Sequence, residues 1–290
     1  MKNKFVIIVP TFNRLPYLKN LMICLRSQTI KDFRLIIVDS SSSNETEEYI
    51  KSEFEDWVDY VKVNTDLFWT GAINAGIKYV QNNYFETEGL ILLNDDTEVN
   101  VDFFEQLINL YNKENKALIG CVNLSAEDKS TVLWAGSKTN SWLAFTNYYF
   151  KGQNISNIKS NKITESFTLI GRGLFIPMVV FSDIGLFDEE HFKHRGDTEF
   201  PLRAKKEGYK LLVSLKSKVY SFPDQTYSMD IGKLRIRDFK KVFFDFRSSS
   251  YIKTRFYYAK SATTNSLQFL SFFIIEMSLH FRRYILRLFF

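Results

Sequence analysis

Short apolar runs recur along the first half of the chain and alternate with stretches of helical periodicity. The runs lie at residues 5–9, 33–38, 89–93 and 117–122, with a further strand candidate at 60–63. Short continuous apolar runs are typical of strands buried on both faces. Between the first two runs, apolar residues recur every three or four positions up to about Gln28, which predicts a helix. This alternation predicts an α/β fold with a mostly parallel sheet flanked by helices.

Further helices are expected where polar caps precede apolar periodicity. Asn44 is expected to cap an acidic helix, with Glu47 in the position of a capping box. Residues 66–76 contain two glycines and are expected to form a loop that opens a helix through about Val80. A helix is also expected over 101–111, and another runs to about Glu207, where Gly208 ends it.

The pattern changes after the fifth apolar run. Residues 130–168 contain short aromatic segments between polar stretches, which predicts irregular or antiparallel structure. Gly171-Arg172-Gly173 then interrupts a strand-like run, where small residues allow close approach of a ligand or another backbone. A short helix over 177–181 and two strands at 211–213 and 218–220 complete the prediction.

Carboxylates follow the strand predicted at 89–93. Asn94, Asp95 and Asp96 come directly after it, while Asn13 and Arg14 follow the first strand and Asp39 the second. The carboxyl ends of parallel strands share one edge of a sheet, so these side chains should converge there. Two adjacent carboxylates repel unless a cation or a ligand compensates, and Mg²⁺ or Mn²⁺ is held in this way. A solvated turn is the alternative, because Asn and Asp favour turns.

Composition indicates a globular protein, with 45% hydrophobic and 24% charged residues. Cys24 and Cys121 are far apart and match no metal or redox spacing, so we expect buried free thiols and a reducing cytoplasm. No export signal is evident, and no apolar run approaches the roughly 20 residues needed to cross a bilayer. The basic charge is concentrated near the end: residues 231–290 hold 12 Lys or Arg against 3 Asp or Glu, a balance of +9.

Several motifs in a fixed order resemble the family 2 glycosyltransferases. They are Val6–Arg14, Val38-Asp39, Trp69–Ile77, Leu92–Thr97, Gly185–Glu189, Gly196-Asp197, Leu202–Ala204 and Gly208-Tyr209. The resemblance covers about Phe5 to Tyr220, and the nearest branch is similar to bacterial rhamnosyl- and galactofuranosyl-transferases. It implies an A-type glycosyltransferase fold, an inverting mechanism, a UDP- or dTDP-sugar donor and a divalent metal.

The resemblance also assigns roles to particular residues. It implies that Asp39 contacts the nucleotide base, Asp95 the ribose and Asp96 the metal. The other residues that it places along the donor are Pro10, Thr11, Asn13, Arg14, Trp69, Gly71 and Asn74.

The resemblance places the catalytic base at Asp197, before a helix. The acceptor hydroxyl must lose a proton as it attacks, and a helix N-terminus favours the ionised carboxylate that accepts it. Glu199 is the competing acid, and Asp197 acting only as a helix cap is the alternative. Gly171, Arg172, Gly173 and Glu199 are expected in the acceptor region. For Arg172 the alternative stays open that it forms a structural ion pair and binds neither phosphate nor acceptor.

The sequence departs from the family pattern twice. Asn94 replaces the first acid of the Asp-x-Asp motif, and residues 218–224 contain no metal-binding His. Metal dependence is therefore expected to be weak, or Asp224 substitutes.

We expect residues 1–225 to form the catalytic domain, with 1–123 binding the donor and 124–225 the acceptor, and 226–290 to form a helical extension. In the extension, an apolar stripe recurs at helical spacing with arginines beside it. Its members are Leu267, Leu270, Ile274, Met277, Phe281, Tyr284 and Leu288. Such a helix predicts peripheral binding to the inner face of the plasma membrane. The alternative is packing on the catalytic domain or on another subunit. The interleaved aliphatic and aromatic residues argue against nucleic acid.

The sequence thus predicts a glycosyltransferase that transfers sugar to a glycan or lipid-linked acceptor in bacterial surface polysaccharide synthesis. Two alternatives remain open. A sugar-nucleotide pyrophosphorylase would need a glycine-rich turn after the first strand, and Pro10–Arg14 contains no glycine. A non-catalytic assembly protein would not need the acids Asp95, Asp96 and Asp197.

Overall fold

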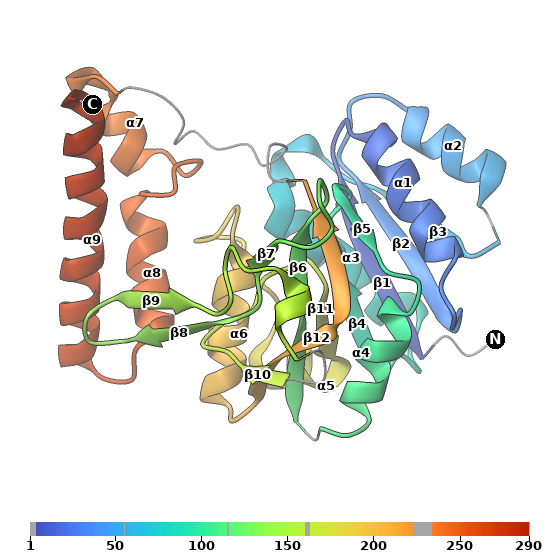
Figure 1. Cartoon of the computed structure of the whole chain (residues 1–290). Helices are drawn as coiled ribbons and strands as arrows, with labels where there is room; N and C mark the ends of the chain where they lie inside the picture. Colours follow the sequence, from blue (N-terminus) through green and yellow to red (C-terminus); the bar gives the residue numbers. More distant parts are fainter. Residues whose placement is uncertain (1–3, 55, 115, 160–162, 223–233, 290) are drawn as a thin grey trace.

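The computed structural model describes residues 4–54, 56–114, 116–159, 163–222 and 234–289, and a mixed sheet forms its centre (Figure 1). In this part of the chain the strand order is β10-β12-β6-β11-β4-β1-β2-β3, with β5 paired to β12 and β7 to β6. The strands are β1 (Phe5–Thr11), β2 (Phe33–Asp39), β3 (Val58–Lys62), β4 (Gly89–Leu92), β5 (Thr97–Val99), β6 (Ala117–Ser125), β7 (Val132–Trp134), β10 (Ile163–Glu165), β11 (Leu174–Pro177) and β12 (Lys210–Ser221).

Strands β4, β1, β2 and β3 run parallel, as the apolar runs predict. Strand β11 lies antiparallel between β4 and β6, and β6 again runs parallel to β12. The sheet is therefore mixed in its second half and mostly parallel overall. The expected α/β class is confirmed.

Alternating side chains of the central strands build two cores, one on each face of the sheet. Ile7 and Val9 of β1 point to the face covered by α1 (Leu15–Arg26), α2 (Glu45–Glu53) and α4 (Phe103–Tyr111). Val6 and Ile8 point to the face covered by α3 (Phe68–Asn83), α5 (Met178–Ile184) and α6 (Gly196–Lys206). Because successive strand residues face opposite ways, a continuous apolar run is what a strand covered on both faces requires.

Residues 66–76 are helical, so the loop predicted there is wrong. A 3-10 turn, η1 (Thr65–Leu67), leads directly into α3, and both glycines lie inside that helix. A Cβ on Gly76 would lie 2.8 Å from Ile8 Cγ2 and 2.9 Å from Val38 Cγ2. The glycine therefore lets α3 pack closely on β1 and β2, and packing overrides the usual helix-breaking effect of the residue.

Two smaller predictions also need correction. The acidic helix α2 begins after Asn44, but the Asn44 side chain makes no capping hydrogen bond, so the capping box is not formed. The two strands predicted at 211–213 and 218–220 are one strand, β12, whose register with β6 shifts between Ser214 and Lys218. The helix predicted to end before Gly208 does so, and Gly208 has a φ of +82°.

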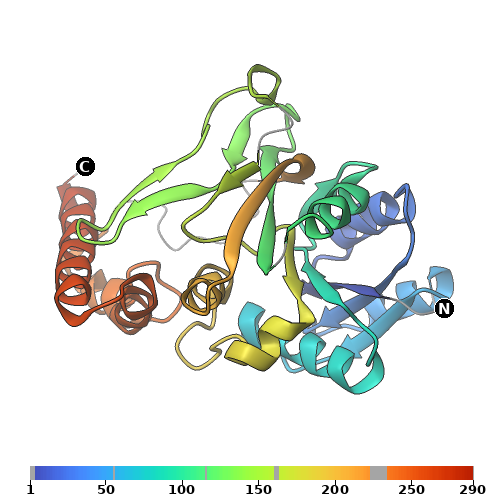
Figure 2. The ribbon, with the colours of Figure 1, turned by 90° about the horizontal axis from the view of Figure 1, so that it is seen from below.

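Residues 130–168 are largely antiparallel or irregular, as predicted. They include η2 (Ile155–Asn157) and a two-stranded hairpin of β8 (Ser137–Asn140) and β9 (Phe145–Tyr148). Figures 1 and 2 show this hairpin reaching away from the sheet to the last helix of the chain. At its tip, Ser271 Oγ donates to the carbonyl oxygen of Trp142 at 2.7 Å.

The end of the chain forms a helical layer beside α6. It consists of η4 (Ile236–Asp238), α7 (Phe239–Phe244), α8 (Ile252–Ala262) and α9 (Ser266–Phe289). Helix α8 lies between α6 and α9, and Leu202 of α6 shares a small core with Ala259 of α8 and Phe272 of α9. The predicted domain boundary at 225/226 lies outside the described residues.

Helix α9 packs through a different face from the predicted stripe. Phe272 and Tyr284 are buried, while Leu267, Leu270 and Ile274 are 72%, 53% and 53% exposed. Of the predicted stripe, Tyr284 is buried, Met277 and Leu288 are partly buried, and the other four members are exposed. None of the described helices is both long enough and apolar enough to span a bilayer.

Candidate active site

Two buried carboxylates lie where β4 ends, and the loop after β1 reaches them. Thr11 Oγ1 donates to Asp95 Oδ2 at 2.8 Å. The guanidinium of Arg14 lies 3.5 Å from Asp95 Oδ1 and 3.2 Å from Asp96 Oδ2. The pairing of β1 with β4 places these two loops side by side. The predicted convergence at one edge of the sheet is therefore confirmed.

Burial makes this acidic pair electrostatically costly. Asp95 and Asp96 are 5% and 2% exposed. Desolvation and the neighbouring Asp96 raise the pKa of Asp95 to about 6, although Arg14 and Thr11 act in the opposite direction. Asp96 Oδ1 is buried without a hydrogen-bond partner. Because a buried carboxylate oxygen normally has a partner, this atom indicates a site that binds a cation or a donor group.

The segment before β11 connects the acidic pair to Asp197. Arg172 Nη2 lies 3.9 Å from Asp96 Oδ2, and the backbone N–H of Gly171 donates to Asp197 Oδ2 at 2.7 Å. Arg172 is also close enough to lower the pKa of Asp197. Two consecutive residues thus contact the two acids that the sequence assigned to metal binding and catalysis.

Both glycines beside Arg172 are required by close packing. A Cβ on Gly171 would lie 2.7 Å from the Trp69 ring and 3.2 Å from Asp197 Cβ. Gly173 has a φ of +86°, and its Cβ would lie 2.8 Å from Val219 Cγ2. Gly171 therefore lets the backbone approach Asp197 closely, and Gly173 lets it pack against β12.

Asp197 lies in the first turn of α6 and is partly exposed. The residue at the N-cap is Arg195, so Asp197 does not cap the helix as the alternative proposed. Desolvation raises the pKa of Asp197, against the lowering effects of the Gly171 N–H and of Arg172 and Arg195. The helix end does favour the ionised form, because the Thr198 N–H lowers this pKa, but desolvation acts in the opposite direction and is the largest effect.

Helix α3 contributes its first turns to the same region. Trp69 Nε1 donates to Asn94 Oδ1 at 3.0 Å, so Asn94 orients the indole ring that packs on Gly171. Asn74 is buried and donates to the Phe187 carbonyl oxygen and to Glu189 Oε2. A Cβ on Gly71 would also lie 3.4 Å from that Glu189 oxygen. Trp69 thus faces the acidic turn, whereas Asn74 holds the loop after α5.

Asp39 ends β2 and is fully buried. Its Oδ1 accepts from the Ser41 N–H at 2.7 Å, and its Oδ2 accepts from Tyr60 Oη at 2.8 Å. Lys62 Nζ lies 3.4 Å from Oδ2. Tyr60 and Lys62 are not among the site residues predicted from the sequence, because their contacts with Asp39 depend on the register of β2 with β3, which aligns Asp39 with Lys62.

The loops after β1 and β2 are fastened to each other close to Asp39. The Asn13 N–H donates to Ser41 Oγ at 2.7 Å, and the Ser42 N–H donates to Asn13 Oδ1 at 3.2 Å. Asn13 has a φ of 53°, a left-handed conformation that Asn tolerates better than most residues. Pro10 lies within β1 opposite Val38.

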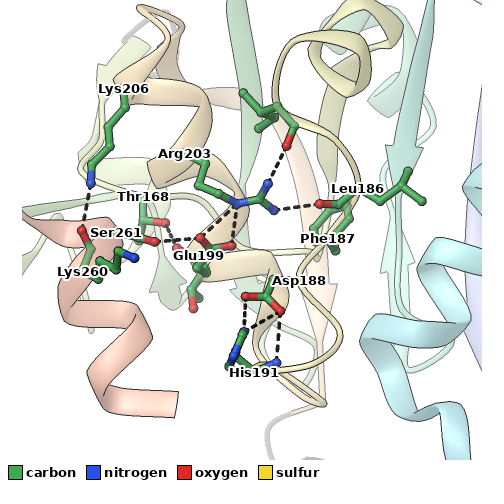
Figure 3. A network of polar contacts seen from close by, with 12 residues as sticks. Thr168, Leu186, Phe187, Asp188, His191, Glu199, Arg203, Lys206, Lys260 and Ser261 are labelled. Carbon is green, nitrogen blue, oxygen red and sulfur yellow. Dashed lines mark hydrogen bonds and ion pairs between the residues drawn. The ribbon is translucent and has the colours of Figure 1, made fainter. Parts of the chain in front are cut away.

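Glu199, kept as the competing acid, is engaged in a structural network instead (Figure 3). Both of its oxygens lie 3.0 Å from Arg203 Nε, and Ser261 Oγ of α8 donates to Oε1 at 2.7 Å. The same guanidinium donates to the carbonyl oxygens of Ile184 and Leu186. Glu199 therefore joins α6 to α8 and to the end of α5. Its carboxylate is buried and bound by these partners, so we assign it a structural role and none in the acceptor region.

With this geometry in place, comparison with known proteins identifies the family. Residues 6–176, more than half of the chain, match the family described as glycosyl transferase family 2. The chain belongs to that family.

Relatives of known sequence or structure agree with this assignment. A protein of Rickettsia typhi named as an uncharacterized glycosyltransferase is 27% identical over 222 residues, which cover 74% of this chain and 63% of the relative. The chain thus spans less than two thirds of that relative's length.

Similarity to solved structures confirms the predicted A-type glycosyltransferase fold. One is GalNAc-T7 with UDP, GalNAc and Mn²⁺, with a TM-score of 0.61 and 15% identity, covering 95% of this chain and 55% of that one. Another is residues 1–349 of TarS of S. aureus in complex with UDP-GlcNAc, also with a TM-score of 0.61 and 15% identity. It covers 96% of this chain and 72% of that one.

Proposed function

We propose that this chain transfers a sugar from a nucleotide-sugar donor to a hydroxyl group of a glycan or lipid-linked acceptor, with inversion at the anomeric carbon. The observation that carries the proposal is that one short segment, Gly171-Arg172, contacts both the Asp95–Asp96 pair and Asp197. Arg172 lies 3.9 Å from the buried Asp96, and its neighbour Gly171 binds Asp197. A donor diphosphate at the acidic pair and an acceptor hydroxyl at Asp197 would meet across this segment.

The donor would lie along the loops after β1, β2 and β4. Arg14 and Arg172 approach the acidic pair from two sides, where guanidinium groups suit phosphate oxygens. Asp39 would receive the base only after exchanging one of its present partners, Tyr60 or Lys62. UDP in the structure of GalNAc-T7 and UDP-GlcNAc in that of TarS support a UDP- or dTDP-sugar as donor.

A divalent cation, Mg²⁺ or Mn²⁺, fits the acidic pair. Asp96 Oδ1 has no partner, and Asp95 lies beside it. One or two carboxylates together with substrate phosphates are enough to hold Mg²⁺. No cluster of three or more His, Cys, Asp or Glu side chains suited to a metal occurs among the described residues, and Asp224 lies outside them. When bound, the cation would stabilise the charge on the departing diphosphate. Mn²⁺ in the GalNAc-T7 structure supports this proposal.

Asp197 would take the proton of the attacking hydroxyl. Burial raises the pKa of its carboxyl, so the carboxylate is a stronger base than an exposed one. The Gly171 N–H fixes one carboxylate oxygen at 2.7 Å. Trp69 packs against Gly171 and would exclude water from this side of the reacting centre.

We further propose a cytoplasmic enzyme of surface polysaccharide synthesis that binds the inner membrane face through α9. Leu267, Leu270 and Ile274 leave an exposed apolar stripe, and Arg282 and Arg283 lie exposed on the same helix. Interfacial helices combine these two properties. A lipid-linked acceptor would then be within reach of the enzyme.

A donor-hydrolysis screen tests the proposed function. UDP-, dTDP- and GDP-sugars are incubated with the full chain, with and without Mn²⁺, and the released nucleoside diphosphate is measured. We expect release from one nucleotide class that depends on the metal and is lost in Asp96→Asn. No release from any donor, or equal release by the Asp96→Asn variant, would argue against a glycosyltransferase.

A further inference from the structure

A polar cavity of about 420 Å³ lies outside the acidic centre described above. Its walls come from the β8–β9 hairpin, the turn before α6, and helices α8 and α9. Figures 1 and 2 show the hairpin bridging the space between the sheet and α9. The cavity is therefore formed only because the terminal helices dock beside the catalytic fold.

Cationic side chains dominate this cavity. Arg195, Arg255 and Arg283 line it together with His280, and Glu276 is the only acidic residue among the described lining residues. The three guanidinium groups leave a net positive charge even with Glu276 ionised. Arginines arranged around a concave site are suited to carboxylate and phosphate groups, which they bind through paired N–H donors.

One ion pair in the wall has unused hydrogen-bonding capacity. Arg255 Nη1 lies 3.1 Å from Glu276 Oε1, and both side chains are 13% exposed. Arg255 Nε and Glu276 Oε2 are buried without hydrogen-bond partners. Each atom can still make a hydrogen bond, Arg255 Nε as a donor to an oxyanion and Glu276 Oε2 as an acceptor from a hydroxyl group. A ligand that carries both anionic and hydroxyl groups satisfies both residues, whereas a simple anion satisfies one.

The cavity also has an aromatic wall and lies near the candidate base. Tyr148 of β9 lines it and is 47% exposed, so its ring is available to the apolar face of a sugar. Arg195 comes two residues before Asp197 and is close enough to influence its ionisation. A chain bound in the cavity could therefore continue toward Asp197.

We propose that this cavity is an acceptor subsite that binds an acidic carbohydrate through a carboxylate or phosphate group. That the bound carbohydrate is the acceptor rests on the proposed function, whereas its binding to the cavity can be measured without catalysis. Carboxylate and phosphate ligands both present an oxyanion on a hydroxylated chain, and two probes distinguish between them. An oligogalacturonate carries carboxylates, and a glycerol phosphate oligomer carries phosphates.

The test is calorimetric titration of the full chain with each probe, with UDP present so that the donor loops are occupied. A neutral malto-oligosaccharide is the control ligand. We expect one anionic probe to bind more tightly than the neutral one. Arg283→Gln should weaken that binding about tenfold, since it removes a charge-assisted contact. Arg282→Gln is the matched control, because Arg282 is the exposed neighbour that lines a different, apolar cavity.

Each outcome is decisive. Tight binding of the oligogalacturonate or of the phosphate oligomer, weakened by Arg283→Gln alone, supports the subsite and identifies its anion. Equal binding of anionic and neutral probes, absence of binding, or equal losses in the two variants overturns it. Donor hydrolysis, measured separately on the same protein preparations with nucleotide-sugars, separates the two proposals. Hydrolysis without anion binding removes only the subsite, and anion binding without hydrolysis removes only the transferase function.

Discussion

Asp95 and Asp96 destabilise the folded state in the absence of a ligand, because two adjacent carboxylates are buried there. Both are buried and adjacent, and the pKa of Asp95 is raised to about 6 from an ordinary 3.8. A raised carboxyl pKa means that the folded state binds the proton more tightly than the unfolded state. The protonated Asp95 carboxyl therefore stabilises the folded state fully below pH 3.8, and this contribution is lost as the pH rises through about 6. At neutral pH this ionisation costs about 3 kcal/mol.

Asp95→Asn should accordingly stabilise the metal-free protein. The substitution removes a buried charge and keeps the shape of the side chain. We expect a higher melting temperature at pH 7.5, equivalent to about 1–3 kcal/mol, and little difference at pH 3.5, where the wild-type carboxyl is protonated. Thermal unfolding of both proteins at the two pH values checks this. A lower melting temperature for Asp95→Asn at pH 7.5 would mean that Arg14 and Thr11 more than compensate the charge.

Asp197→Asn tests the candidate base. The variant retains the size of the side chain but cannot accept a proton, so kcat should fall by about 10²–10⁴. In the wild type, turnover should rise with pH as Asp197 loses its proton, because burial raises its pKa. The matched variant is Glu199→Gln, which should reduce stability more than kcat, since Glu199 binds Arg203 and Ser261. A folded Glu199→Gln protein with the larger loss of kcat would reverse the two roles.

At the scale of single residues, the sequence predicted which side chains gather at the strand ends better than it predicted their contacts. Strand-end positions follow from periodicity, so Asp39, Asp95 and Asp96 could be placed at one edge. Their partners depend on register and on packing between distant elements. Lys62 beside Asp39 follows from the alignment of β2 with β3, and Ser261 beside Glu199 from the docking of α8 on α6. Neither leaves a local signal in the sequence.

Helix α3 shows how packing overrides a local pattern at the scale of an element. Glycines at 71 and 76 usually indicate a loop, yet both lie within α3, and Gly76 faces Ile8 and Val38. The position of the helix against the sheet explains Gly76, whereas Gly71 lies against Leu67 and Glu189. Strand β12 is a comparable case, because its irregular register in the middle resembles a break between two strands.

Gly76→Ala should therefore destabilise the protein despite the higher helix propensity of alanine. The new Cβ would lie 2.8 Å from Ile8 and 2.9 Å from Val38 in a close-packed core, and overpacking of this kind costs about 1–3 kcal/mol. Gly71→Ala is the comparison, because its nearest contact, 3.0 Å from Leu67 Cβ, is milder. Denaturant unfolding of both variants measures the difference. A Gly76→Ala protein as stable as the wild type would show that α3 can shift freely.

At the scale of the whole molecule, the terminal helices are part of the packed structure. Ser261 binds Glu199, and Lys206 Nζ donates to the carbonyl oxygen of Lys260 (Figure 3). Thr254 Oγ1 donates to the carbonyl oxygen of His191. Removing these helices would expose buried surface of α6, so point substitutions test the surface of α9 better than a deletion does.

The exposed stripe of α9 should be required for membrane binding. The double variant Leu270→Glu with Ile274→Glu places two charges on it, and we expect loss of sedimentation with anionic liposomes. Leu286→Glu is the control, because Leu286 is exposed on the opposite side of α9. High salt should weaken only the electrostatic part of wild-type binding. Unchanged sedimentation of the double variant would exclude the stripe as the anchor, and a change in molecular mass instead would assign it to a subunit contact.

Equilibrium binding of a nucleoside diphosphate is the most direct test of the central claim that the acidic pair at the end of β4 holds a donor with a divalent cation. UDP, dTDP and GDP are titrated into the wild-type chain and into Asp96→Asn, each with and without Mn²⁺, by calorimetry. The account predicts that one nucleotide binds the wild type more tightly with Mn²⁺, and that Asp96→Asn loses this dependence while remaining folded. Binding that is unaffected by both the metal and the substitution would contradict it.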